Sequence, residues 1–391
     1  MMPTIQISNE VRAWLNARQD AMIGFITELA RMESPSSDRE ALLEILSWLE
    51  QHFAALGMHT IHVPGKKSGG YLYARPKEKS PDQPLQLLIG HCDTVWPLHT
   101  LREMPLNRTE ERLSGPGVYD MKAGITQIFF ALQCLSDLGI HPGVLPVVLI
   151  NSDEEVGSRE STEAIRRLAR IADRAFVLEP PLGLDGKLKT ARKGLGRFTL
   201  TVHGKAAHAG LDPEKGANAI VEMARLVQKL YALNDFETGT TVNVGLIEGG
   251  ISPNTIAPHS RVVLDVRVPT RAEGERVEAV IRSLKTEAEG VRLEIEGGFG
   301  RPPMEPTPGN QQLWALAAKT GKALGIELRQ AAAGGGSDAN TTSQYTATLD
   351  GLGTPGDGAH ARHEHIQTTR LAERTSLLTL LLMMDPLKQN R

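Results

Sequence analysis

The chain has 391 residues, 40% of them hydrophobic, which is enough for about two or three domains with buried cores. Its 43 lysine and arginine residues are balanced by 46 aspartate and glutamate residues, and the net charge of -3 argues against a basic protein that binds nucleic acid or anionic lipid. We therefore expect a small-molecule partner, with no nucleic acid and no membrane.

Cysteine content and the ends of the chain indicate the compartment. The two cysteines, Cys92 and Cys134, are too few for a disulfide framework or a four-cysteine zinc site. Glu10 and Arg12 precede any apolar run, so the N-terminus does not resemble a signal peptide. We expect a cytoplasmic protein, with the periplasm as the alternative if a leader has been removed. The apolar run at 377–384 is too short to span a bilayer and is predicted to be a buried last helix.

From residue 8 to about 180, amphipathic helical stretches alternate with short β-rich runs. The apolar runs LQLLIG (85–90), VLPVVLI (144–150) and RAFVLE (174–179) lead directly into HCDTV, NSDEE and EP. Ligands of α/β sheets bind at the carboxyl ends of the strands, so these polar groups are candidates for one shared site. The alternative is that they are ordinary polar loops at strand ends.

Residues 197–299 follow a different pattern, with the order strand, helix, strand, strand, helix, strand. The expected strands cover 197–204, 240–250, 261–269 and 291–299, and the expected helices 218–233 and 271–290. This βαββαβ order is typical of a ferredoxin-like α+β domain. The proline-rich segment 301–309 marks the return to the α/β pattern. We predict a catalytic domain of residues 1–193 and 303–391, with an inserted domain of residues 194–302.

Several motifs carry groups that can bind metal ions, although each is ambiguous alone. One residue separates His91 from Asp93, so on a strand the carboxylate can accept the ring N–H. Asp120 lies at a glycine-rich bend before an apolar helix, where it can also be a simple helix cap. The glycine spacing at this bend does not fit a dinucleotide fingerprint.

Acidic and histidine clusters follow later in the chain. Three consecutive acids, Asp153, Glu154 and Glu155, end an apolar strand, and burying them together is costly without cations. A solvated acid cluster is the alternative. Glu179 precedes two prolines, and the segment 356–365 contains three histidines. Two histidines with four carboxylates form the donor set of a carboxylate-bridged centre for two metal ions, for which zinc suits the nitrogen and oxygen ligands.

The motifs HCDTV, GPGVYDMKAG, NSDEEVGS, LEP, GKAAHAG, GGGSDAN and GAHARHE, in this order, resemble those of the zinc peptidases that include glutamate carboxypeptidase, acetylornithine deacetylase and aminoacylase. The similarity is greatest to the glutamate carboxypeptidase branch. It implies an α/β catalytic domain, whose mixed sheet has helices on both faces, with an inserted lid and dimerisation domain. It also implies two zinc ions per subunit, which Co²⁺ or Mn²⁺ can replace, and a homodimer formed through the inserted domain.

The resemblance assigns roles residue by residue. It implies the metal ligands His91, Asp120, Glu155, Glu179 and His360. It makes Asp120 the bridge between the metals, followed by a cis peptide bond. It makes Glu154 the general base and Asp93 the residue that orients His91. His363 and His365 have no counterpart in the family.

In the inserted domain, the resemblance implies that His208 stabilises the oxyanion and that Asn254 and Arg267 bind the carboxylate or carbonyl of the substrate. Gly335, Gly336 and Ser337, in GGGSDAN, would present backbone N–H groups to the carboxylate. A role in domain packing is the alternative for all of these residues. The loop lacks the Gly-Lys-Ser/Thr ending of a phosphate-binding loop.

These assignments predict a metallohydrolase that cleaves an amide bond in a peptide or N-acyl amino acid and releases an amino acid with a free α-carboxylate. A carboxypeptidase is favoured, and an N-acyl-amino-acid deacylase is the alternative. A catalytically inactive metal-binding protein is disfavoured because Glu154 and every ligand position are filled. We expect lid closure by movement near Lys193 and Pro302.

Overall fold

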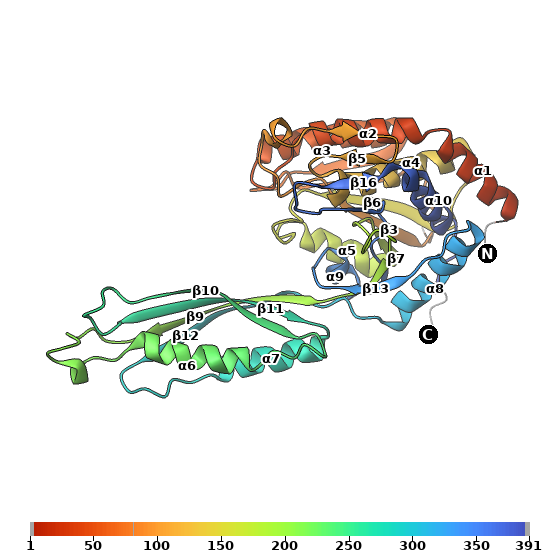
Figure 1. Ribbon diagram of the computed structural model, residues 1–391. Helices are drawn as coiled ribbons and strands as arrows, with labels where there is room; N and C mark the ends of the chain where they lie inside the picture. The colour runs from red at the N-terminus through yellow and green to blue at the C-terminus, as the bar shows by residue number, and fades with distance from the viewer. Residues whose placement is uncertain (1–3, 81, 388–391) are drawn as a thin grey trace. The chain divides into compact units, whose positions relative to one another are not determined.

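The structure, a computed structural model, describes residues 4–80 and 82–387 and divides into two compact units. The first consists of Met1–Ala191, Pro306–Ala333 and Ser337–Arg391, and the second of Arg192–Glu305 with Gly334–Gly336. Figure 1 labels many of the elements of both units. Among the described residues, no helix has the length and apolar character needed to cross a membrane.

The first unit is built on a six-stranded mixed sheet with the order β1-β2-β6-β3-β7-β14. Its strands are Met58–Val63 (β1), Tyr71–Pro76 (β2), Leu85–His91 (β3), Leu145–Asn151 (β6), Ala172–Val177 (β7) and Ala347–Leu349 (β14). Strand β3 is parallel to its neighbours β6 and β7, whereas β1 and β2 are antiparallel to the strands beside them. The carboxyl ends of β3, β6 and β7 therefore meet at one edge of the sheet.

Helices cover both faces of this sheet. They are Ile5–Asn16 (α1), Gln19–Arg31 (α2), Arg39–Ala55 (α3), Ala123–Asp137 (α4), Thr162–Ile171 (α5), Pro308–Ala323 (α8), Ala339–Thr342 (α9) and Leu371–Leu382 (α10). Leu88 of β3 belongs to the large core that includes residues of α1 to α4 and α10. Leu87 and Ile89 alternate to the opposite face, and α5 packs against β3 and β7. The last helix, α10, is buried along most of its length, as its sequence predicts.

Smaller sheets fix the loops around the main sheet. One has the order β15-β16-β5-β4, from strands Gly356–Asp357, His365–Gln367, Arg112–Ser114 and Asn107–Arg108. It brings the loop after β15 next to the segment after β5, where the N–H of Gly115 donates to the carbonyl of Glu364 at 3.1 Å. A second small sheet pairs Leu188–Arg192 (β8) with Gln330–Ala333 (β13).

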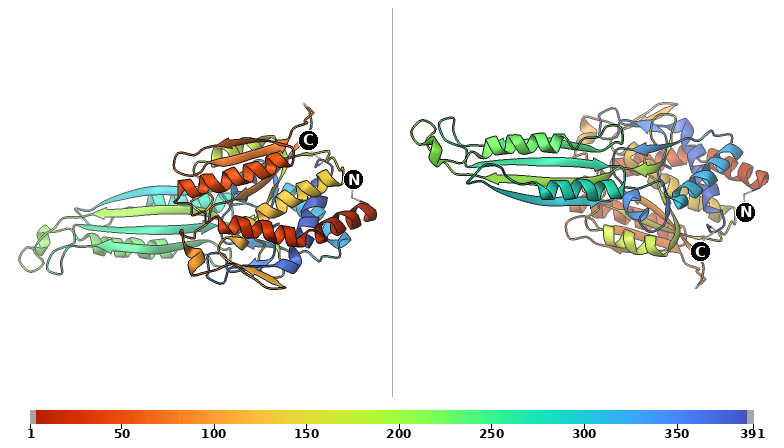
Figure 2. Two further views of the ribbon diagram at one scale, coloured as in Figure 1. Left: turned by 90° about the horizontal axis from the view of Figure 1, so that it is seen from above. Right: turned by 90° about the horizontal axis from the view of Figure 1, so that it is seen from below.

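The second unit is a four-stranded antiparallel sheet with the order β10-β11-β9-β12. In chain order its elements are Gly194–His203 (β9), Ala219–Tyr231 (α6), Thr241–Gly249 (β10), His259–Val268 (β11), Arg271–Ser283 (α7) and Arg292–Arg301 (β12). Both helices lie on one face of the sheet, as the two views of Figure 2 show. This is the expected ferredoxin-like arrangement.

Helix α7 is shorter than its sequence predicts, because it ends at Ser283 instead of continuing to residue 290. The buried carboxylate of Glu222, on α6, accepts hydrogen bonds from the backbone N–H groups of Glu287 at 2.9 Å and Ala288 at 3.2 Å. These donors are therefore used by a neighbouring helix and not by another turn of α7. The residues of the segment 284–290 do not by themselves predict that Glu222, on another helix, accepts these hydrogen bonds.

Candidate metal centre

Asp120 lies at the centre of two groups of candidate metal ligands. One group contains His91, Asp120 and Glu179, the other Asp120, Glu155 and His360, and the ligand atoms within each group lie within 4.8 Å of one another. Oδ1 of Asp120 is 3.2 Å from Nε2 of His91, whereas Oδ2 is 3.5 Å from Nε2 of His360. The two oxygens of one carboxylate thus face two different imidazoles, as a bridging ligand requires.

The chain around Asp120 folds as a distorted helical turn, Val118–Lys122 (η2), that leads into α4. The peptide bond between Asp120 and Met121 is cis, as the resemblance implies. Gly117, just before the turn, has a φ of 72°, and a Cβ here would lie 2.7 Å from the side chain of Thr94. Glycine is therefore favoured at this bend.

His91 ends β3 and is almost completely buried. Its Nδ1 lies 2.9 Å from the backbone carbonyl oxygen of Asp93, to which it donates, so Nε2 is the ring nitrogen left to bind a metal ion. Nε2 is also 3.4 Å from Oε1 of Glu179, which follows β7 at the same edge of the sheet. The local structure therefore prepares this nitrogen for a metal ion.

Asp93 orients His91 in a different way from the one that its spacing predicts. Strand β3 stops at His91, and the Asp93 carboxylate is 3.4 Å from Nδ1, farther than the residue's own carbonyl. The carboxylate instead accepts the backbone N–H groups of Glu154 and Glu155, each at 3.2 Å, and the hydroxyl of Ser36 at 2.7 Å. Asp93 therefore connects the loop after β3 to the acidic loop after β6.

The three consecutive acids after β6 have different environments. Asp153 is buried and accepts the hydroxyl of Ser161 at 2.6 Å and the N–H of Glu160 at 2.7 Å, just before α5. The carboxylate of Glu155 is close to His360, with Oε2 at 3.0 Å from Nε2 of that histidine. Glu154, between them, is half-buried and its N–H is held by Asp93. Asp153 therefore stabilises the segment before α5, whereas Glu155 lies beside the candidate metal ligand His360.

Of the three histidines in the segment 356–365, His360 is the one in a candidate ligand group. It has a φ of 61°, an uncommon conformation for a residue other than glycine. His363 is exposed and lies 3.7 Å from the Asp357 carboxylate, and His365 is buried in β16 with Nδ1 at 2.9 Å from the carbonyl of His363. Loop geometry therefore separates three histidines that look alike in the sequence.

The charges at this site favour a cation. Burial lowers the pKa of His91, but the carboxylates beside it, first that of Asp120 and then those of Asp93 and Glu179, raise it well above its usual value. The hydrogen bond to Glu155 raises the pKa of His360 to about 9, and burial raises the pKa of Glu155. Crowded carboxylates therefore attract protons to both imidazoles, and divalent cations can take the place of these protons. The nitrogen and oxygen donors fit zinc.

Glu364 is a further buried carboxylate at this site, outside the set of residues predicted from the sequence. It is 0% exposed and accepts four hydrogen bonds, three of them from the backbone of residues 117–120. Burial raises its pKa to about 7. The acid lies between two histidines in a polar loop, and nothing in that pattern marks it as a buried residue.

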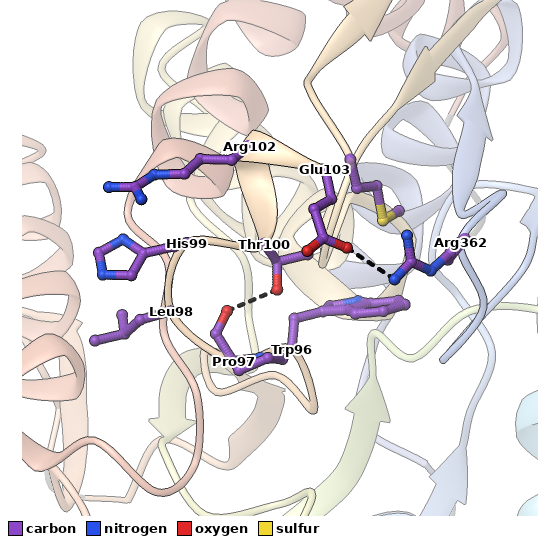
Figure 3. Close-up of a pocket in the computed structure, with 9 residues that line it drawn as sticks. Trp96, Pro97, Leu98, His99, Thr100, Arg102, Glu103 and Arg362 are labelled. Carbon is purple, nitrogen blue, oxygen red and sulfur yellow. Dashed lines mark hydrogen bonds and ion pairs between the residues drawn. The ribbon is translucent and has the colours of Figure 1, made fainter.

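A pocket of about 430 Å³ lies beside the loop that carries His360. Residues 96–100 and 102–104 and Arg362 line it, as Figure 3 shows, and Arg362 pairs with Glu103 at 2.8 Å. Trp96, which forms part of its wall, donates its indole N–H to Glu364 at 2.8 Å. No candidate metal ligand lines this pocket, so it is a neighbour of the metal centre and not the centre itself.

In the second unit, hydrogen bonds fix the orientation of His208. Its exposed ring accepts the backbone N–H groups of Gly210 and Leu211 at Nδ1, both at 3.1 Å. The proton of the neutral ring is therefore on Nε2, which can donate a hydrogen bond. Asn254 lies close by in the fold, since its carbonyl accepts the N–H of Ala209 at 2.9 Å.

Two arginines hold the carbonyl groups of the glycine loop. Nη1 of Arg267 donates to the carbonyl of Gly334 at 2.9 Å, and Nη1 of Arg192 donates to those of Gly335 and Gly336, both at 3.0 Å. In a trans peptide the N–H points opposite to the C=O, so the N–H groups of Gly335 and Gly336 face away from these guanidinium groups. Arg192 is buried, and its local sequence does not mark it as a partner of the glycine loop.

Arg267 and Ser337 also have side-chain partners within the protein. The carboxylate of Asp265 accepts from Nε of Arg267 at 2.8 Å. Ser337 is fully buried, its N–H donates to Oδ1 of Asn340 at 2.9 Å and its hydroxyl to Asp350 at 3.0 Å. The donors of Ser337 are therefore used inside the protein, unlike those expected of a substrate-binding residue.

The chain is similar in sequence to known peptidases. A model of the peptidase dimerisation domain of the M20 family matches residues 190–292. The chain is 29% identical over 379 residues to carboxypeptidase G2 of Pseudomonas sp. (strain RS-16), covering 93% of this chain and 89% of that protein. It is 25% identical to succinyl-diaminopimelate desuccinylase of Delftia acidovorans, covering 75% and 80%. The chain is therefore similar to zinc peptidases of the M20 family, and this similarity supports the glutamate carboxypeptidase-like branch.

Solved structures confirm the predicted fold class. An M20 family metallo-carboxypeptidase from Sulfolobus solfataricus superposes with a TM-score of 0.72 at 17% identity, covering 93% of this chain and 99% of that one. An aminopeptidase from Bacillus cereus gives a TM-score of 0.78 at 22% identity, covering 93% and 98%. The chain therefore shares its overall fold class with these two peptidases.

Proposed function

We propose that this protein is a two-zinc exopeptidase of the carboxypeptidase type, which hydrolyses an amide bond and releases an amino acid with a free α-carboxylate. The observation that carries this proposal is the position of Asp120, whose two oxygens face the imidazoles of two ligand groups. One zinc ion would be held by His91, Asp120 and Glu179, and the other by Asp120, Glu155 and His360. The similarity to a carboxypeptidase supports the type of bond.

In this proposal Glu154 and His208 have separate roles in catalysis. Bound zinc ions supply a water of lowered pKa and polarise the carbonyl of the substrate. Glu154 accepts the proton of the attacking water and returns it to the leaving nitrogen, since an amine leaves readily only when protonated. Nε2–H of His208 donates to the developing oxyanion, a role supported by the backbone hydrogen bonds at its Nδ1.

Recognition of the substrate is proposed to depend on its carboxylate. Arg267 would form a charged hydrogen bond to it, assisted by Asn254. The N–H groups of Gly335 and Gly336 would be donors to the substrate on the opposite side of the glycine loop, because they point away from the arginines. Ser337 belonged to the predicted set, but its engaged donors support a role in shaping the loop. This division makes a free α-carboxylate the main determinant of binding.

The test is hydrolysis by the zinc-loaded protein of dipeptides and N-acyl amino acids, each with a free carboxylate and as its amide. We expect the free acids to be cleaved and the amides to be poor substrates. Faster cleavage of dipeptides than of N-acyl amino acids supports a carboxypeptidase, and the reverse supports the deacylase that similarity to a desuccinylase suggests. Equal rates for acids and amides would contradict carboxylate recognition.

Arg267→Met should remove the preference for the free acid. Hydrogen bonds to charged groups contribute about 1.5–3 kcal/mol, so kcat/KM for the acid should fall about 10- to 100-fold, mainly through KM. The rate for the amide should change little. Arg261→Met is the matched control because Arg261 lies on the same strand, β11, and pairs with Glu248 instead. An equal loss for acid and amide would indicate damage to the fold and not loss of recognition.

We also propose a homodimer through the inserted unit, because its sequence matches a peptidase dimerisation domain. Strand β10 is an edge strand of the four-stranded sheet, and Leu246 and Ile247 on it are 68% and 63% exposed. Ile220 and Val221 of α6 are also exposed. An apolar edge strand with unpaired backbone groups is suited to pairing with another copy.

Ile247→Lys should therefore convert the dimer to a monomer, because a charged side chain on an edge strand opposes pairing between sheets. Size-exclusion chromatography with light scattering gives the mass directly. Ile171→Lys changes an exposed residue at the end of α5, in the other unit, and should leave the dimer intact. A dimer that survives Ile247→Lys would place the interface elsewhere.

A further inference from the structure

The buried carboxylate of Glu364 connects the two segments that carry Asp120 and His360. Its Oε1 accepts the backbone N–H groups of Tyr119 at 2.9 Å and Asp120 at 3.1 Å. Its Oε2 accepts the N–H of Gly117 at 3.0 Å and the indole N–H of Trp96 at 2.8 Å. One side chain therefore holds three backbone donors of the turn that contains the bridging candidate.

The backbone of Glu364 closes the loop that contains His360. Its N–H donates to the carbonyl of Ala361 at 3.0 Å, and its carbonyl accepts the N–H of Gly115 at 3.1 Å. The N–H of Ala361 in turn donates to the carbonyl of Gly358 at 2.8 Å. The position of His360 is thus fixed by a short loop that ends at the residue whose side chain holds Asp120.

We propose that Glu364 is a positioning residue for the metal centre, which sets the backbone of Asp120 and the loop of His360 relative to each other. The inference rests on the proposed function only in that these two residues are metal ligands. Asp120 must present its oxygens to two separate groups, so a small rotation of its backbone would weaken both. Fully buried, with four donors and outside both ligand groups, Glu364 is suited to prevent that rotation.

The test compares Glu364→Gln with Glu222→Gln. Glutamine keeps the shape of glutamate but replaces one acceptor oxygen by an NH₂ donor, which would face the N–H donors now bound to that oxygen. Glu222 is the matched control because it is a buried carboxylate that also accepts two backbone N–H groups, and none of its recorded partners is a candidate metal ligand. Both changes should lower the Tm of the metal-free protein.

Titration of the metal-free full chain with Co²⁺, followed by visible absorption, separates positioning from stability. We expect Glu364→Gln to bind Co²⁺ about 10- to 100-fold more weakly, as is typical when a residue supporting metal ligands is lost, and to change the cobalt absorption bands. Glu222→Gln should keep the affinity and the spectrum. A Glu364→Gln variant with wild-type cobalt affinity and spectrum but a lower Tm would overturn the proposal.

A second variant keeps the test decisive if Glu364→Gln does not fold. Trp96→Phe removes one of the four donors, and we expect cobalt binding to weaken about 2- to 10-fold, the effect of a single hydrogen bond. Wild-type affinity and spectrum in Trp96→Phe would then overturn the proposal. Wild-type protein that binds two Co²⁺ ions but hydrolyses no substrate would contradict the proposed function alone, whereas wild-type protein that binds no Co²⁺ would overturn both.

Discussion

Glu154→Gln should abolish most turnover while the protein keeps both zinc ions. Glutamine has nearly the same shape as glutamate but cannot accept the proton of the attacking water, so kcat should fall about 10²- to 10⁴-fold. The N–H of residue 154 still donates to Asp93, so the loop should keep its conformation. Measuring kcat together with zinc per chain, by mass spectrometry of the dialysed protein, tests both parts.

Substitution of the neighbouring residue, Glu155, should have a different effect from substitution of Glu154. Glu155→Gln should weaken zinc binding because Glu155 belongs to a ligand group, whereas Glu154 belongs to neither. Glu163→Gln, an exposed change on α5 where Glu163 pairs with Arg167, should alter neither kcat nor zinc content. An unchanged kcat in Glu154→Gln would exclude this residue as the base, and loss of zinc would show that it acts as a ligand.

Asp120→Ala should have the largest effect on metal binding of any single change. Because its two oxygens face different ligand groups, removing the carboxylate weakens both at once. Loss of a residue that merely supports ligands typically costs 10- to 100-fold in metal affinity, so we expect a loss above about 100-fold here and no measurable turnover. Competition with a chromophoric chelator measures the affinity of each site.

The comparison is Glu179→Ala, which removes a residue of one group and leaves Asp120, Glu155 and His360 in place. It should keep about one zinc ion per chain, whereas Asp120→Ala should keep less than one. If the two variants retained equal zinc, Asp120 would not be a bridging residue. Circular dichroism of the metal-free proteins controls for loss of fold.

The loops at the carboxyl ends of the strands show how much of the candidate site can be predicted from local sequence. The apolar runs that become β3, β6 and β7 are recognisable because their side chains are buried on both faces of the sheet, and polar residues follow each run directly. Their convergence at one edge follows from parallel strands in an α/β sheet. The sequence therefore predicts which loops meet. It does not predict which of Asp153, Glu154 and Glu155 faces the neighbouring loops.

Long-range hydrogen bonds account for the features that sequence reasoning missed. Glu364 is separated from its backbone partners by more than 240 residues, and Arg192 by more than 140 from the glycine loop. The premature end of α7 has the same cause, an acceptor on another helix. Asp93 accepts backbone donors far along the chain, and its own carbonyl takes the role predicted for its side chain.

By itself, the sequence determined the donor types, their order, the two kinds of domain and the family to which the chain is similar. Residue chemistry and strand or helix periodicity are local properties, so they can be read without coordinates. The tertiary structure decided that Asp120 faces two imidazoles, that His360 and not its neighbours approaches Glu155, and that Glu364 is buried. These outcomes depend on contacts between segments distant in the chain, and backbone donors and acceptors are the same in every residue except proline.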